Sequence, residues 1–201
     1  MNTINNIPVY KALVKDEDEG MFVVSLVDYP AIERDFVAFD KQEPICLAIQ
    51  DAEEQKVLGP VMIPDFPIFR RNNEGFEYYI VYEADTIKAM AEKFFAERRV
   101  NDVDTQHNFE LEDGVVLTQA FFKDTEKGIN PQGFEDLPDG TLFFEYHITD
   151  SDLWDRVVSG ELKGFSLAGV FDIEPQGDEA EAQNLSKDID ELITKIENKL
   201  K

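Results

Sequence analysis

The sequence predicts an α+β protein, in which a mainly antiparallel β-barrel or strongly curved sheet is flanked by helices and followed by a C-terminal amphipathic helix. Apolar runs of strand length recur from Val9 to Glu174 and are separated by polar turns. Two segments of that region instead repeat apolar residues at helical spacing. The 201 residues include 16 phenylalanines and are 43% hydrophobic, which is enough apolar material for one packed core.

The first elements of this domain are strands. Gly20–Val27 is an unbroken apolar run, and Pro30 closes it. Residues 45–50 and 56–63 flank a polar turn, so we expect them to form a β-hairpin. Residues 76–82 are rich in tyrosine and β-branched residues and predict a further strand.

A helix is predicted over residues 85–99. Asp85 is its expected N-cap, and Arg98 and Arg99 suit the negative end of the helix dipole. Its apolar residues recur every three or four positions, as expected for one buried face: Ile87, Met90, Ala91, Phe94 and Phe95.

The second half of the domain adds three strands and a short helix. Val115–Phe122 and residues 141–148 predict strands on either side of a loop rich in Gly, Pro and Asp. A helical pattern over residues 151–159 ends at Gly160, and a last strand follows through Phe171.

The chain divides into three parts. Residues 1–174 form the barrel domain, and residues 175–184 are an acidic linker with few apolar residues. Residues 185–201 are predicted as an amphipathic helix that is too short to be stable alone, so it needs a surface to pack on. Self-association as a homodimer, docking on the domain and binding a partner all stay open. Its apolar stripe consists of Leu185, Ile189, Leu192, Ile196 and Leu200.

Charge and composition exclude several classes of partner. The formal net charge is −24, from 19 Lys and Arg against 43 Asp and Glu, so phosphate backbones and anionic lipids are repelled. We therefore expect no nucleic-acid and no membrane partner. Cys46 is the single cysteine and leaves no intramolecular disulfide, and no segment resembles a signal peptide or a membrane span. We expect a cytosolic protein.

A serine between small residues is the most informative feature. Ser166 lies in Gly164-Phe165-Ser166-Leu167-Ala168-Gly169, where small neighbours leave its hydroxyl reachable. A serine nucleophile needs a base, and the sequence has only His107 and His147. From the residues alone, Ser166 is equally well a strand serine bonded to backbone, and His107 a surface histidine. Asp102, Asp104 and His107 could in principle hold a metal, but the sequence favours neither a metal nor a cofactor.

Several segments together resemble the phage procapsid (prohead) maturation proteases of the XkdF-like serine protease type. They are residues 25–33 (SLVDYPAIE), 78–82 (YYIVY), 91–95 (AEKFF), the segment ending in His107-Asn108, residues 122–124 (FKD), and Leu153-Trp154 through Ser166. The resemblance covers roughly residues 8–174. This family is similar to the herpesvirus assembly proteases, which implies a β-barrel ringed by helices, with Ser166 as the nucleophile and His107 as its general base.

The third catalytic position departs from the family pattern. The resemblance places Gln119 where an acid is common, and Ala168 where another acid often follows the serine. A glutamine can hold the imidazole tautomer but cannot stabilise the imidazolium, so Gln119→Glu is expected to increase proteolysis if no other acid serves. The alternatives are Glu145, Glu110, Glu112 or His147, or a weak or inactive protease fold.

The resemblance implies a serine endopeptidase that cleaves scaffold and major capsid proteins during procapsid maturation. It would act in the host cytoplasm, in the interior of the assembling procapsid. The alternative is a catalytically weak or inactive protein on the same fold, with a structural or assembly role in the capsid. The distance between the Ser166 and His107 side chains separates the two hypotheses.

Overall fold

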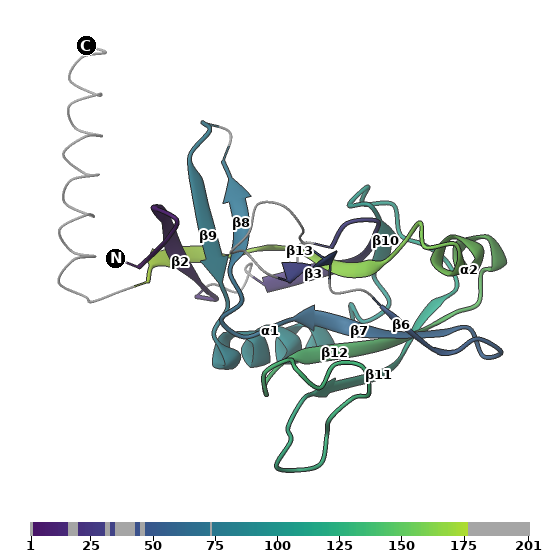
Figure 1. Cartoon of the computed structure of the whole chain (residues 1–201). Coiled ribbons are helices and arrows are strands. Elements are labelled where there is room, and N and C mark those ends of the chain that lie inside the picture. The colour runs from purple at the N-terminus through teal and green to yellow at the C-terminus, as the bar shows by residue number, and fades with distance from the viewer. Residues whose placement is uncertain are drawn as a thin grey trace, which may run out of the picture.

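The computed structural model describes residues 2–15, 20–30, 33–34, 43–44, 47–72 and 74–176. These residues form a mixed α+β fold with two helices and three main sheets, none of them closed into a barrel. In Figure 1, β3 and β13 form one layer above β7, β12 and β11, while β2, β9 and β8 stand to one side. The α+β class is confirmed by this arrangement.

The sheet at the side has five strands and does not contain the serine motif. Its strand order is β1-β2-β9-β8. β1 pairs with the first part of β2, and β14 pairs with the last part of β2. The β2–β9 pair is parallel and the remaining pairs are antiparallel. Its members are β1 (Thr3–Ile4), β2 (Ile7–Leu13), β8 (Ile68–Arg71), β9 (Glu77–Val81) and β14 (Asp172–Pro175).

The three-stranded sheet carries the serine motif. Its central strand is β3 (Gly20–Val27), which pairs antiparallel with β13 (Gly164–Val170) and parallel with β10 (Val103–Thr105). The buried apolar run of β3 suits a central strand that is covered on both faces. The parallel partner β10 has only three residues, which is too short for a periodic signal in the sequence.

The third sheet is a four-stranded antiparallel sheet with the order β11-β12-β7-β6, in which two hairpins lie side by side. It contains the expected hairpin, and its strands are β6 (Ala48–Asp51), β7 (Lys56–Met62), β11 (Val115–Phe122) and β12 (Leu142–Ile148). A separate two-stranded ribbon joins β4 (Glu33–Arg34) to β5 (Glu43–Pro44).

Two helices cover the sheets. Helix α1 (Ala84–Ala96) packs on the core through four buried residues, among them Ile87 and Phe94. Its N-cap is Glu83, so the expectation that Asp85 caps it is wrong; Asp85 lies in the first turn, where its charge favours the helix dipole. Helix α2 (Ser151–Val158) is capped by Asp150, whose side chain accepts a hydrogen bond from the Leu153 N–H.

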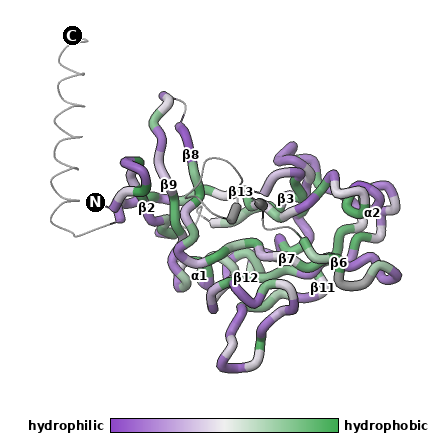
Figure 2. The backbone as a smooth tube through the Cα atoms, viewed as in Figure 1, coloured by the Kyte–Doolittle hydropathy of each residue, from purple (hydrophilic) through white to green (hydrophobic). Residues whose placement is uncertain are grey.

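The main core lies between the layer of β3 and β13 and the layer of β7, β12 and β11. Its side chains separate the two layers, so the sheets do not close into the expected barrel. Figure 2 shows apolar stretches in β3, β7 and β12. Where β13 approaches β7, the Phe165 ring packs on Gly59, and a Cβ at Gly59 would lie 3.2 Å from that ring and 2.7 Å from Leu47. Side chains therefore fill the seam, and among the described strands β13 and β7 share no backbone pairing. The layered packing of separate sheets replaces closure.

The expected linker begins inside the described residues, where Pro175 ends β14 and the Gln176 N–H bonds the Val9 carbonyl. Residues 177–184, the expected C-terminal helix and Cys46 lie outside the described residues. The expected division of the chain at residue 174 is accordingly still a prediction.

Candidate active site

The site begins with a row of three polar residues across the three-stranded sheet. Ser25 at the centre is the register partner of Ser166 on β13 and of Asp104 on β10. Register partners in a sheet present their side chains on the same face, so these three residues share one face. All three are buried in a sheet that is otherwise mainly apolar.

A tight turn after β10 brings His107 back over this row. Gln106 and His107 both have a φ of 56°, in the left-handed region that non-glycine residues seldom adopt. The Gln106 N–H bonds the Leu26 carbonyl, and the Asn108 N–H bonds the Thr105 carbonyl. These bonds fix the turn against β3, and such strained backbone is concentrated at functional sites.

The His107 ring lies between the two serines of the row. Its Nε2 is 3.0 Å from Ser166 Oγ, and its Nδ1 is 2.8 Å from Ser25 Oγ. Both distances are within hydrogen-bond range. Ser25 is fully buried, whereas the ring of His107 is partly exposed. The sheet therefore holds a Ser25–His107–Ser166 array in which the imidazole bridges the two hydroxyl groups, with Ser25 in the core.

Asp104 completes the row and supports the histidine turn. Its Oδ2 accepts a hydrogen bond of 2.7 Å from the Phe109 N–H, which ties the far end of the turn to β10. Its Oδ1 is buried and has no hydrogen-bond partner among the described residues. A buried carboxylate oxygen without a donor is costly, so its position beside Ser25 calls for a functional explanation.

The other sequence candidates do not reach the histidine. Both ring nitrogens of His107 face serines. Gln119 lies on β11 of another sheet, where its amide donates to Glu145 on β12. Glu112 instead accepts from the Thr105 hydroxyl.

The two remaining alternatives are also placed away from the imidazole nitrogens. His147 lies on β12, opposite Val116 and Lys56, and Glu110 is exposed with its N–H bonded to Asn108. The structure thus brings Ser166 and His107 together and leaves Gln119 apart.

Ser25 is the residue that sequence reasoning missed. It opens the segment SLVDYPAIE, which carried part of the family resemblance, yet its hydroxyl interrupts an apolar strand without a visible partner in the sequence. A serine in a strand that is buried on both faces needs a hydrogen-bond partner, and that was the available signal. Its partner is 82 positions away, so only the fold identifies it.

Two further observations concern metal binding and membrane association. In the part of the chain that the structure describes, no group of three or more His, Cys, Asp and Glu residues is arranged to hold a metal ion. Neither of the two described helices has the length and apolar character needed to cross a membrane.

Comparison with known proteins identifies the family. Residues 43–174, about two thirds of the chain, match the family described as "Putative phage serine protease XkdF". No curated protein and no solved structure is significantly similar to the chain. The matched region includes His107 and Ser166, and Ser25 lies before it. The chain therefore belongs to the XkdF family of phage serine proteases.

Proposed function

We propose that the protein is a serine endopeptidase that cleaves scaffold and capsid proteins during maturation of a phage procapsid. The observation that carries this proposal is the 3.0 Å contact between His107 Nε2 and Ser166 Oγ. A nucleophile within hydrogen-bond reach of a base, which is itself oriented by a third group, is the arrangement that covalent catalysis requires.

In the acylation step, Ser166 Oγ attacks the scissile carbonyl carbon and its proton moves to His107 Nε2. The resulting oxyanion is held by backbone N–H groups near the serine. The C–N bond then breaks as the leaving amine takes the proton from His107. A water molecule repeats the sequence on the acyl-enzyme: it gives its proton to His107, and Ser166 recovers that proton as the product acid leaves.

The tautomer of His107 assigns a role to Ser25. For Nε2 to accept the Ser166 proton, Nδ1 must carry the ring proton and donate it to Ser25 Oγ, 2.8 Å away. The register partner of Ser25 on its other side is Asp104, whose buried Oδ1 makes no hydrogen bond with it. We assign Ser25 as the positioning residue for the base, in the role that the family resemblance assigns to Gln119.

Asp104 supplies the negative charge that a serine lacks. Its Oδ1 is buried and unbonded among the described residues, on the strand next to Ser25. Its negative charge lies next to the Ser25–His107 pair and, in the proposed mechanism, favours the imidazolium that forms as Ser166 attacks. Asp104 does not touch the reacting atoms and is also a positioning residue.

The charge of the chain agrees with a place inside a procapsid before DNA enters. A net charge of −24 disfavours binding to the packaged genome, so the enzyme and the processed scaffold can leave before packaging. We place the protein in the host cytoplasm, within the assembling shell.

The proposal is tested with the full-length protein and a fluorophosphonate probe that labels activated serines. Wild type should be labelled at Ser166, while Ser166→Ala and His107→Ala should not. Ser159→Ala is the matched serine control, because Ser159 is exposed and its hydroxyl bonds only the Arg156 carbonyl among the described groups. His147→Ala is the matched histidine control.

The substrate is tested by co-expressing each variant with the scaffold and major capsid proteins of the same phage. New peptide termini identified by mass spectrometry are expected with wild type and with both controls, and not with Ser166→Ala. If folded wild-type protein neither takes the probe nor cuts these proteins, the enzyme assignment is wrong and a structural role in the capsid replaces it.

A further inference from the structure

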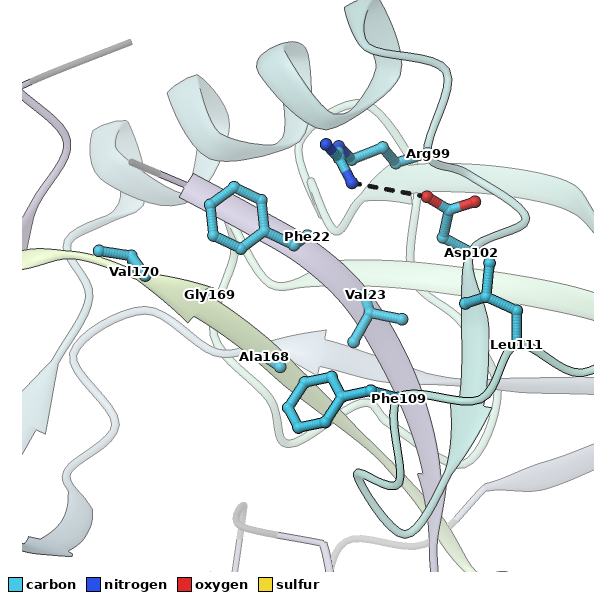
Figure 3. Close-up of a pocket in the computed structure, with 9 residues that line it drawn as sticks. All are labelled: Phe22, Val23, Arg99, Asp102, Phe109, Leu111, Ala168, Gly169 and Val170. Carbon is cyan, nitrogen blue, oxygen red and sulfur yellow. Dashed lines mark ion pairs between the residues drawn. The ribbon is translucent and has the colours of Figure 1, made fainter. Parts of the chain in front are cut away.

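A pocket of about 460 Å³ lies beside the Ser166–His107 pair and is not used in the chemistry described above. Its floor comes from β3 and β13, and its walls come from the segments before and after β10 (Figure 3). The volume is within the range of about 300–1,000 Å³ that is typical of sites for small ligands and side chains.

The sheet register places this pocket next to the nucleophile. Val23 and Ala168 line the pocket and are register partners on β3 and β13. Ser25 and Ser166 form the register pair two positions away on the same two strands. Residues two apart in a strand share a face, so Ala168 lies on the face of Ser166 at a distance of about 7 Å along β13. A substrate side chain adjoining the scissile carbonyl would reach this place.

The wall of the pocket is apolar and open to a ligand. Phe109 is 72% exposed and Leu111 58% exposed, and Figure 3 shows both directed at the pocket from the segment after His107. Phe109 also has a φ of 60°, a costly conformation for an aromatic residue. The hydrogen bond from the Phe109 N–H to Asp104 stabilises this strained backbone conformation, which presents the ring to the pocket.

A bulge shapes the floor. The register passes from Val23–Ala168 to Met21–Gly169 and skips Phe22, whose ring joins the pocket wall. At Gly169 an added Cβ would lie 2.3 Å from the Gly20 carbonyl oxygen, so only glycine allows the two strands this close approach. Bulges next to active sites commonly redirect side chains in this way.

The charges at the end of the pocket disfavour an acidic ligand. Arg99 lies over the Phe22 ring and pairs with Glu97 and Asp102, at 2.9 and 3.7 Å. One cation therefore faces two carboxylates. An acidic side chain would meet net negative charge there, whereas an apolar side chain can fill the wall left open by Phe109 and Leu111.

We infer that this pocket determines cleavage specificity by binding a large aliphatic or aromatic side chain of the residue that contributes the scissile carbonyl. The inference rests on the proposed endopeptidase function, and it names Ala168 and Phe109 as specificity-determining residues. Ala168, which stands where the family resemblance places an acid, keeps the floor of the pocket clear.

The test uses N-acyl aminoalkyl diphenyl phosphonates that carry the side chain of Ala, Leu, Phe or Glu. Ser166 Oγ displaces one phenoxide from phosphorus, the serine proton leaves with it as phenol, and the side chain occupies the proposed pocket. Rates of Ser166 labelling are followed by intact mass. The Leu or Phe probe is expected to react about 10- to 200-fold faster than the Ala probe, and the Glu probe most slowly.

Two variants probe the pocket itself. Ala168→Leu fills the floor and Phe109→Ala removes the wall, so each should bring the ratio of the Phe rate to the Ala rate close to one. Ala120→Leu and Phe76→Ala are the matched controls and should keep the wild-type ratio, since Ala120 is exposed on β11 and Phe76 is exposed just before β9.

The outcomes separate the two proposals. Labelling of Ser166 without a preference for Leu or Phe, or a preference that survives in Ala168→Leu and Phe109→Ala, overturns the pocket assignment and leaves the endopeptidase intact. Failure of every probe to label the folded wild-type protein overturns both.

Discussion

Ser25 and Ser166 lie directly opposite each other on β3 and β13, and their hydroxyl groups contact the two nitrogens of a single imidazole, that of His107. One strand pair therefore supplies both the nucleophile and the group that orients the base. Because the separation of register partners is fixed by backbone pairing, the sheet itself sets the distance that the imidazole has to span. Strands position the two serines, and a hydrogen-bonded turn after β10 positions the imidazole, which favours preorganisation.

Replacing Ser25 should slow turnover without weakening substrate binding. Ser25→Ala removes the group that holds His107 Nδ1, so we expect kcat to fall about 10- to 100-fold. That is at or below the lower end of the roughly 10²- to 10⁴-fold contribution of positioned proton transfer, and below the roughly 10⁴-fold loss for a direct acid–histidine bond. KM should stay close to the wild-type value. Steady-state kinetics on a cleaved capsid or scaffold peptide measure both quantities. An unchanged kcat would remove Ser25 from the site.

Replacing the charge of Asp104 should lower activity while stability is kept or increased. Asp104→Asn retains an oxygen for the Phe109 N–H but removes a buried negative charge. We expect a fall in kcat of about 10-fold or more, because the site loses the negative charge that favours the imidazolium. The melting temperature should stay constant or rise, since burying an amide costs less than burying a charge.

The Asp104→Ala variant is the comparison for a purely structural role. It also loses the bond that closes the histidine turn, so it should lower both kcat and the melting temperature. If Asp104→Asn loses no activity, the carboxylate serves the turn alone.

Gln119→Glu should leave proteolysis unchanged, contrary to the gain expected from the sequence. In the structure Gln119 is paired with Glu145, so the substitution places two carboxylates opposite each other on β11 and β12. We expect the free energy of unfolding to decrease by about 0.2–1 kcal/mol, and Gln119→Lys to increase it by a similar amount. Denaturant titration gives these values, and cleavage rates for both variants should equal that of wild type. A faster Gln119→Glu enzyme would restore Gln119 as the third catalytic residue.

The protein should lose stability in alkali because of two buried tyrosines. Burial raises the pKa of Tyr82 from 10 to about 12, and burial together with the nearby Asp102 charge raises the pKa of Tyr146 further. A raised folded-state pKa gives stability that is complete below pH 10 and is lost as the pH rises through the folded-state value. Between pH 10 and 12 we expect a loss of about 1.4 kcal/mol per pH unit for each tyrosine.

Tyr82→Phe and Tyr146→Phe each remove one of these two titrating groups. Each substitution should therefore reduce the slope of the unfolding free energy against pH by about 1.4 kcal/mol per pH unit. Tyr29→Phe is the control, because Tyr29 is 57% exposed, and it should keep the full slope. Chemical denaturation at fixed pH values between 9 and 12 supplies the measurement.

Local patterns were sufficient for several strands, both for the buried apolar run of β3 and for the half-exposed β11. β3 and β11 have the predicted bounds, and the hairpin of β6 and β7 forms across the predicted turn. β10 was missed because three residues carry no period, although its parallel pairing with β3 is what places His107. The predicted barrel was wrong because closure depends on contacts between sheets. Phe165 of β13 packs on Gly59 of β7 where these strands approach, and neither strand's sequence indicates this contact.

The site was partly predictable for a related reason. Ser166 and His107 could be proposed because the chain offers few alternatives, and the structure places them 3.0 Å apart. Ser25 and Asp104 could not be assigned, because their roles follow from strand register between segments about 80 residues apart. Gln119 was placed by analogy with a pattern in other sequences, and its side chain lies with Glu145 instead.

The order of the chain also determines when the site can exist. Its three contacting residues are at positions 25, 107 and 166, and the nucleophile is carried by β13, which enters at the edge of a sheet whose other two strands are made earlier. Chains fold from the N-terminus during synthesis, and long-range pairings form last. The base is therefore synthesised before the nucleophile that it deprotonates, so a nascent polypeptide cannot cut until β13 has been made and has paired with β3.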